Sequence, residues 1–140
     1  MAHVRRIAFV FLFIASFSCA AKRPANSVDN SLPPNMHVFY GQLDKVWGTL
    51  TTTIQFDYLI PIQILEEEKG YFSSELVRES QPLATKYRVS GTVVFDGAGV
   101  VVTLYKHQQI LENENWKTIP SDLVLEKKIL DAVVQKLSKK

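Results

Sequence analysis

The sequence predicts an α+β domain in which one helix precedes and another follows a four-stranded antiparallel sheet. Apolar residues recur at helical spacing at both ends of residues 36–140. Between these ends apolar and polar residues alternate, and an Asp-Gly pair at positions 96–97 indicates a hairpin. Two helices on one face of such a sheet make a two-layer domain, and the other face must then meet solvent or a partner.

The first helix is expected within residues 37–56. Six apolar residues follow one another at steps of three and four: Phe39, Leu43, Val46, Trp47, Leu50 and Ile54. This stripe predicts an amphipathic helix that covers its own sheet, with a partner-binding face as the alternative. Gly48 and the three threonines at 51–53 weaken the helix, so the position of its end stays open.

The first two strands are expected at residues 59–67 and 71–78, joined by a tight turn at 68–70. The alternating isoleucines of the first strand predict one inward face: Ile60, Ile62 and Ile64. Pro61 cannot donate a ladder hydrogen bond, which places this strand at an edge or a bulge. In the second strand, Phe72 and Leu76 are expected on one face.

After a loop at 79–84, two longer strands are expected at residues 85–95 and 99–111. Their inward residues are predicted by alternation: Tyr87, Val89, Val93 and Phe95 in one, and Val100, Val102 and Leu104 in the other. Four strands in sequence with short turns make an antiparallel meander. Residues 113–120 are expected to form a polar loop.

The last helix is expected to be capped by Ser121 and Asp122. Its apolar stripe consists of Val124, Ile129, Leu130, Val133 and Leu137. The polar residues between them predict a solvated face: Glu126, Lys127, Asp131 and Lys136.

Charge and cysteine content exclude several classes of function. The 140 residues carry a formal charge of +2, with 16 Lys and Arg against 14 Asp and Glu. Arg5 and Arg6 precede Cys19, so the chain from Cys19 onward is neutral. A neutral domain does not gather nucleic acid over long range. A single cysteine makes neither an internal disulfide nor a thiolate metal site.

The N-terminal segment has the three parts of an export signal. A short basic stretch at 1–6 precedes a continuous apolar run at 7–15, which leads into small residues at 16–21. The run is shorter than the about 20 residues of a membrane-spanning helix. A permanent transmembrane anchor is therefore the weaker interpretation.

The residues around Cys19, Ser16-Phe17-Ser18-Cys19, resemble the lipobox of bacterial lipoproteins. The resemblance implies that residues 1–18 are a signal peptide and that Cys19 carries acyl chains, which hold a protein on a membrane. Ala20, by resemblance to enterobacterial lipoproteins, implies the outer membrane facing the periplasm. Residues 19–35, with three prolines, are expected to be a lipidated tether. The alternative is ordinary export with cleavage near Ala20 or Ala21.

The order of predicted elements resembles the helix-grip domain of the BamC-like lipoproteins, accessory members of the outer-membrane β-barrel assembly machine. The likeness is carried by short motifs: Val46-Trp47, the turn Lys69-Gly70, and Ser121-Asp122 followed by Glu126 and Ile129-Leu130. It implies a module that binds an envelope protein. Such proteins commonly carry two of these domains, and this chain has room for one.

No enzyme, metal or cofactor is expected from the sequence. His37 and His107 have no nucleophile or carboxylate at a suggestive spacing and are interpreted as surface or strand-end residues. Glu66, Glu67 and Glu68 are consecutive on a strand and point to alternate faces, so they do not indicate a metal site.

Partner contact is instead expected from exposed aromatic and apolar residues. Trp116 lies in the predicted polar loop, while Val94, Val101 and Tyr105 lie on the sheet face away from the helices. Two alternatives stay open. One is a small-ligand or lipid carrier with a cavity between helices and sheet. The other is an LptE-like partner in lipopolysaccharide export, a family whose domain tends to begin with a strand.

Overall fold

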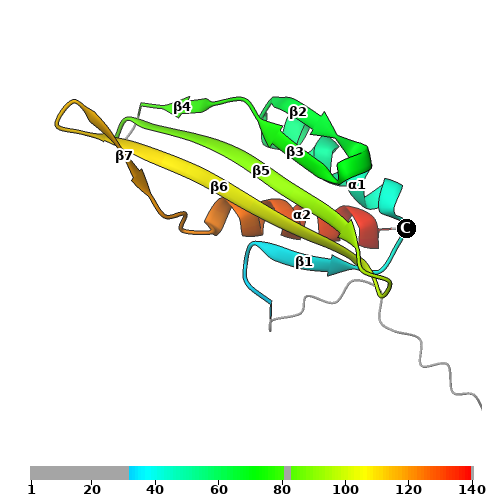
Figure 1. Cartoon of the computed structure of the whole chain (residues 1–140). Coiled ribbons are helices and arrows are strands. Elements are labelled where there is room, and N and C mark those ends of the chain that lie inside the picture. Colours follow the sequence, from blue (N-terminus) through cyan, green and yellow to red (C-terminus); the bar gives the residue numbers. More distant parts are fainter. Residues whose placement is uncertain (1–31, 81–82, 140) are drawn as a thin grey trace, which may run out of the picture.

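The computed structural model describes residues 32–80 and 83–139, which form an α+β fold with an N-terminal and a C-terminal helix packed against an antiparallel sheet (Figure 1). The elements are β1 (Met36–Phe39), α1 (Leu43–Thr52), the π-helical turn η1 (Thr53–Asp57), β2 (Ile62–Glu66), the 3-10 turn η2 (Glu67–Lys69), β3 (Tyr71–Ser74), β4 (Val77–Glu79), β5 (Thr85–Phe95), β6 (Val100–Glu112), β7 (Asn115–Ile119) and α2 (Val124–Ser138).

Within the described residues the sheet has seven strands rather than the predicted four. Its main order is β1-β6-β5-β3-β2, with β4 pairing to β5 and β7 pairing to β6. The four predicted strands correspond to β2, β3, β5 and β6, which lie side by side in that order. The long β5–β6 hairpin forms the spine of the sheet, and β1 and β7 share the outer edge of β6 (Figure 1).

The start of the predicted first helix is wrong, because residues 36–39 form strand β1. His37 and Phe39 lie opposite Val102 and Val100 of β6, and both are buried. The step from Phe39 to Leu43 fits a helix, but residues 36–39 instead form backbone hydrogen bonds with the free edge of β6. This tertiary pairing outweighs the local helical propensity. His37 is therefore a core residue beside the Phe39 ring, with 4.4 Å between ring centroids, and not a surface histidine.

The helix begins at Leu43 and buries Val46, Trp47, Leu50 and Ile54 as predicted. At the predicted weak point, the threonine run, the helix changes from α to π.

Three residues that were predicted to face inward and lie at the ends of elements are exposed. Leu43 is the first residue of α1, Phe95 the last residue of β5 and Val124 the first residue of α2. Periodicity gives the direction of a side chain but not whether the opposite layer extends far enough to cover it.

The prediction that the first expected strand lies at an edge of the sheet is confirmed for β2. The prediction that its isoleucines alternate strictly is wrong. A register shift between Ile62 and Ile64 leaves Ile64 exposed while Ile60 is buried. The predicted strand at 71–78 is likewise divided into β3 and β4. At the break the Glu75 N–H donates to the Pro61 carbonyl, and Leu76 is exposed.

Residues 115–119 form strand β7 where a loop was predicted. Asn113 and Glu114 adopt positive φ, which closes a tight hairpin, and Trp116 pairs with Leu111 of β6. The polar composition concealed this strand because both of its faces are largely exposed. A strand that buries neither face shows no alternation of apolar and polar residues.

Glu126 of α2 was predicted to lie on the solvated face of the helix, and this prediction is wrong because its side chain is fully buried. Its Oε1 accepts the Lys106 backbone N–H at 2.9 Å. That N–H lies in the stretch of β6 between the β1 and β7 pairings, where no strand supplies a carbonyl. Glu126 therefore takes the place of a ladder partner.

Two other side chains close similar gaps. The Ser74 hydroxyl accepts the Val89 N–H at 2.9 Å between β3 and β4. Asn35, at the end of the predicted tether, accepts the Leu104 N–H through its backbone carbonyl, and its side-chain amide donates to the Leu104 carbonyl. The ladder of the central hairpin is thus completed from segments distant in the sequence.

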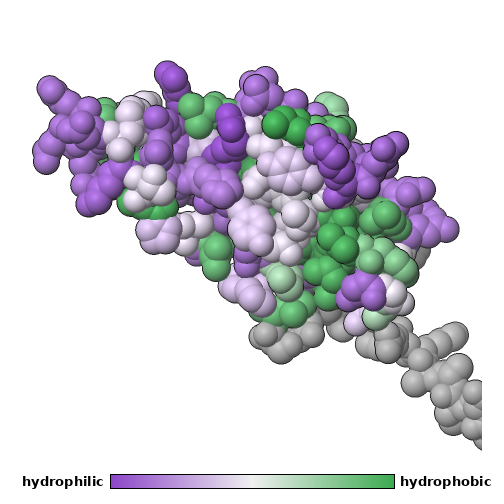
Figure 2. All heavy atoms as spheres, in the orientation of Figure 1, coloured by the Kyte–Doolittle hydropathy of each residue, from purple (hydrophilic) through white to green (hydrophobic). Residues whose placement is uncertain are grey.

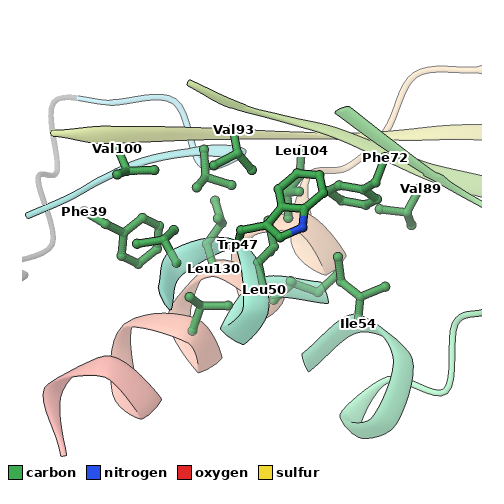
Figure 3. Packing of buried hydrophobic residues seen from close by; sticks show 14 of the residues in the cluster. Phe39, Trp47, Leu50, Ile54, Phe72, Val89, Val93, Val100, Leu104 and Leu130 are labelled. Carbon is green, nitrogen blue, oxygen red and sulfur yellow. The ribbon is translucent and has the colours of Figure 1, made fainter. Parts of the chain in front are cut away.

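The core lies between the helices and one face of the sheet (Figure 3). Trp47 and Leu50 of α1 and Leu130 of α2 meet Phe72 and Leu104 of the sheet. Gly91 makes this packing possible, because a Cβ there would lie 2.5 Å from Cε1 of Phe72. Trp47 is a core residue, as predicted.

Candidate partner-binding face

The face of the sheet opposite the core cluster, called the open face below, is defined by the alternation of the β5–β6 hairpin. Since the core takes Val89, Val93, Val102 and Leu104, their neighbours in each strand point the other way. Paired residues on the open face are Arg88 with His107, Ser90 with Tyr105, Thr92 with Thr103, and Val94 with Val101. Both helices pack on the core side.

The structure places all three predicted contact residues on this one face. Val101 and Tyr105 are four residues apart in β6, and Leu111 is a further six along, so their side chains share a face. Trp116 pairs directly with Leu111 and therefore joins them. The prediction that Trp116 is exposed is confirmed at 42%, but on a strand rather than in a loop.

One end of the open face is apolar. Val101 lies between Val94 of β5 and Val38 of β1, and Val94 is 53% exposed. Figure 2 shows hydrophobic surface gathered towards the turn of the β5–β6 hairpin. This valine cluster is a surface that water solvates poorly.

The middle of the open face is aromatic and hydroxyl-rich. The Tyr105 and His107 rings stack with 6.4 Å between centroids. Ser90 Oγ lies 3.1 Å from His107 Nε2, within hydrogen-bond distance. The spacing of these residues in the sequence did not indicate this pair, because the register of β5 on β6 creates it.

A serine–histidine pair serves as nucleophile and base in hydrolases when a third group orients the histidine. Within the described residues, no carboxylate hydrogen-bonds to His107. Ser90 is 7% exposed in the middle of a strand, where the neighbouring N–H groups take part in ladders. The pair therefore fits a structural hydrogen bond better than a catalytic one.

The other end of the open face is a cationic groove of about 520 Å³. It is open to solvent and lined by Tyr71, Ser73, Leu76, Lys86, Arg88, Ser90, His107, Gln108, Gln109 and Thr118. Lys86 Nζ lies 4.2 Å from the centroid of the Trp116 ring, a cation–π contact. Figure 2 shows hydrophilic surface where β4 and β7 lie.

The groove residues were not among those predicted as functional. The alternation that places Tyr105 on the open face also places Arg88 there, so this signal was present in β5. Arg78 is outside this lining but lies opposite Lys86, and its position depended on the short strand β4, which the sequence did not separate from β3.

Two phenols beneath the surface have raised pKa values. Burial, and to a lesser extent the Glu79 carboxylate, raises the pKa of Tyr87. Burial raises the pKa of Tyr58, and Asp57 and Asp131 add to the effect. A phenol is neutral near pH 7 at its ordinary pKa, and the raised pKa values extend this neutral range to higher pH.

At the hairpin turn next to the valine cluster, the pKa of Asp96 is lowered. Its Oδ1 accepts the backbone N–H groups of Ala98 and Gly99 at 2.9 and 3.0 Å. These donors favour the charged carboxylate.

Two pockets of different size lie where the helices meet the sheet, and the larger, of about 380 Å³, is lined by Phe39 of β1, Val46 of α1 and Leu137 of α2. A pocket bounded by Trp47, Gly70 and Val93 has a volume of about 40 Å³, far below the about 300 Å³ or more of small-molecule sites. Across residues 32–80 and 83–139, no three His, Cys, Asp or Glu side chains lie close enough together to hold a metal ion. The same residues include no helix with the length and apolar character needed to span a bilayer.

Cys19 and the predicted signal at 1–18 lie outside the described residues. Comparisons with protein-family models and with curated proteins gave no match for this chain.

Proposed function

We propose that the chain is a bacterial outer-membrane lipoprotein, anchored in the periplasmic leaflet through acyl chains on Cys19, whose domain binds a protein partner in an envelope assembly complex. It carries no catalytic activity and needs no cofactor in this proposal. The observation that carries it is the open face, which exposes Trp116, Tyr105 and the valine cluster on a rigid sheet.

The chemistry of the open face supports a protein partner. Tyr, Trp and Arg are enriched among the residues that dominate binding energy at protein interfaces. Tyr105, Trp116 and Arg88 bring these three types together on neighbouring strands. The strands hold the side chains in place before binding, which reduces the entropy lost on association.

The order of helix, antiparallel sheet and helix supports the resemblance to the helix-grip domain of BamC-like lipoproteins. The strand β1, which precedes α1, favours the LptE-like alternative more than the sequence did, because that family tends to begin its domain with a strand. Both families are envelope lipoproteins that act through protein partners. The proposal of a lipid carrier has less support, since buried side chains fill the core and the pocket beside Phe39 and Val46 is also lined by Gln42 and Lys45.

Membrane anchoring is tested with Cys19→Ser in the full chain. The wild-type chain is expected to sediment with outer membranes, and the variant is expected to be released into the periplasmic fraction. The intact mass of the mature wild-type chain should start at Cys19 and include the added acyl chains. A variant that stays in the membrane fraction would contradict the anchor.

Partner binding is tested by placing a photo-crosslinking amino acid at position 109 of the full-length chain in cells. A single crosslinked protein adduct is expected. Tyr105→Ala and Trp116→Ala are each expected to reduce the adduct several-fold, since anchor truncations commonly cost about 2 kcal/mol or more. The matched control is Phe56→Ala, which removes a 71% exposed ring from η1. Equal loss from all three variants would contradict a role for the open face.

A further inference from the structure

We propose that the cationic groove at the β4–β7 end of the open face binds an acidic peptide segment of the protein partner. This inference rests on the proposed function and adds to it the chemistry that the partner must present. Lys86 and Arg88 in the groove and Arg78, which lies opposite Lys86 on β4, would bind its carboxylates, and the neighbouring Trp116 and Tyr105 would pack against its apolar side chains.

The register of β4 on β5 produces an unusual row of positive charges. Arg78 lies directly opposite Lys86, and Arg88 follows two residues along on the same face. Like charges directly opposite one another across a ladder are destabilising. A neutral domain has no general excess of cations to account for such a row, so its placement indicates a ligand of opposite charge.

In the described part of the chain, no carboxylate forms an ion pair with this row. Among the described residues, neither arginine forms an ion pair, and the lining of the groove contains no carboxylate. Several lysines elsewhere do have acidic partners: Lys69 with Glu66, Lys117 with Glu112, Lys127 with Asp131, and Lys136 with Asp57. Lys86 and Arg88 thus line the hollow without an ion-pair partner among the described residues, and Arg78 lies opposite Lys86.

The groove also suits a peptide backbone. Ser73, Gln109 and Thr118 supply hydroxyl and amide groups along its length, and Gln109 already donates to the Thr118 hydroxyl at 3.2 Å. Arginine binds carboxylates through two parallel hydrogen bonds, which adds direction to the charge attraction. Since Lys86, which lines the groove, also contacts the exposed ring of Trp116, an extended acidic segment would reach both without leaving the open face.

Fluorescence anisotropy tests this with the full chain in detergent and a labelled octapeptide of alternating Glu and Thr. Its counterpart of alternating Gln and Thr is expected to bind at least about tenfold more weakly, because hydrogen bonds to charged groups are worth more than neutral ones. Arg88→Gln and Arg78→Gln are each expected to weaken the binding of the acidic peptide by about tenfold. The matched control is Lys128→Gln on α2, an exposed lysine in the other layer, which should change affinity less than twofold.

The two arginine variants should melt no lower than the wild-type chain, which separates lost binding from lost folding. If Lys128→Gln weakened peptide binding as much, the proposal would be overturned, because the affinity would then depend on net charge alone. Competition by glucose 6-phosphate or inorganic phosphate at lower concentration than the peptide would also overturn it, in favour of a small anion. If the peptide does not bind while Tyr105→Ala still reduces the partner crosslink several-fold, the inference is wrong and the proposed function stands.

Discussion

The two faces of the β5–β6 hairpin are formed by alternate residues of the same two strands, yet they have different physical roles. On the core face, Val89, Val93 and Leu104 are almost fully buried, and Gly91 admits the Phe72 ring. On the open face, Arg88, Tyr105 and Val94 are exposed. The comparison teaches that a substitution on the core face should change stability, whereas one on the open face should change binding.

The largest effect is expected from truncating neighbours in β3 that lie on opposite faces. Phe72→Ala should lower the free energy of unfolding by about 3–5 kcal/mol, because it empties the centre of the core. Tyr71→Ala, one residue earlier on the open face, should cost about 1 kcal/mol or less. Urea denaturation of the full chain measures both. Similar losses for the two variants would remove the distinction between the faces.

A smaller effect is expected from the carboxylate that closes the ladder of β6. Glu126→Ala should cost about 2–4 kcal/mol, because it leaves a cavity and an unpaired Lys106 N–H. Glu126→Gln keeps an oxygen for that N–H and should cost about 1 kcal/mol. Denaturation curves for the pair separate the two causes. Equal losses would show that the hydrogen bond to Lys106 is not what makes Glu126 important.

The smallest effect is expected at the exposed hairpin turn. The folded-state pKa of Asp96 is lowered below its ordinary value of 3.8, so its stabilising effect is present above pH 3.8. It is lost as the pH falls through the lower folded-state pKa. Asp96→Asn should therefore melt slightly below the wild-type chain at pH 7, and the gap should close towards pH 2. Melting temperatures across this range measure it, and a gap independent of pH would contradict the assignment.

Local patterns predicted those parts of the fold that local forces control. The hairpin at Asp96, the inward side chains of β5 and β6, and the buried stripe of α1 follow from periodicity and turn chemistry. The pattern misassigned residues 36–39, which have the spacing of a helix but form a strand beside β6. It also missed β7, which buries neither face.

The candidate site divides in the same way. Tyr105, Val101 and Trp116 were predicted as contacts because the alternation of the strands and the polar surroundings of Trp116 indicate that these apolar and aromatic residues face away from the core. The contact of Ser90 with His107 and the row of Arg78 opposite Lys86 were not predicted. Both depend on which residue of one strand lies opposite which residue of another.

By itself the sequence determined the α+β class, the apolar stripe of each helix and the alternation that gives the sheet two unlike faces. These follow from side-chain periodicity, which each segment carries within itself. Only the tertiary structure decided that β1 joins β6, that Glu126 is buried as a substitute for a missing strand, and that cations gather at one end of the open face. Each of these depends on strand register and on the neighbours that folding brings together from distant parts of the chain.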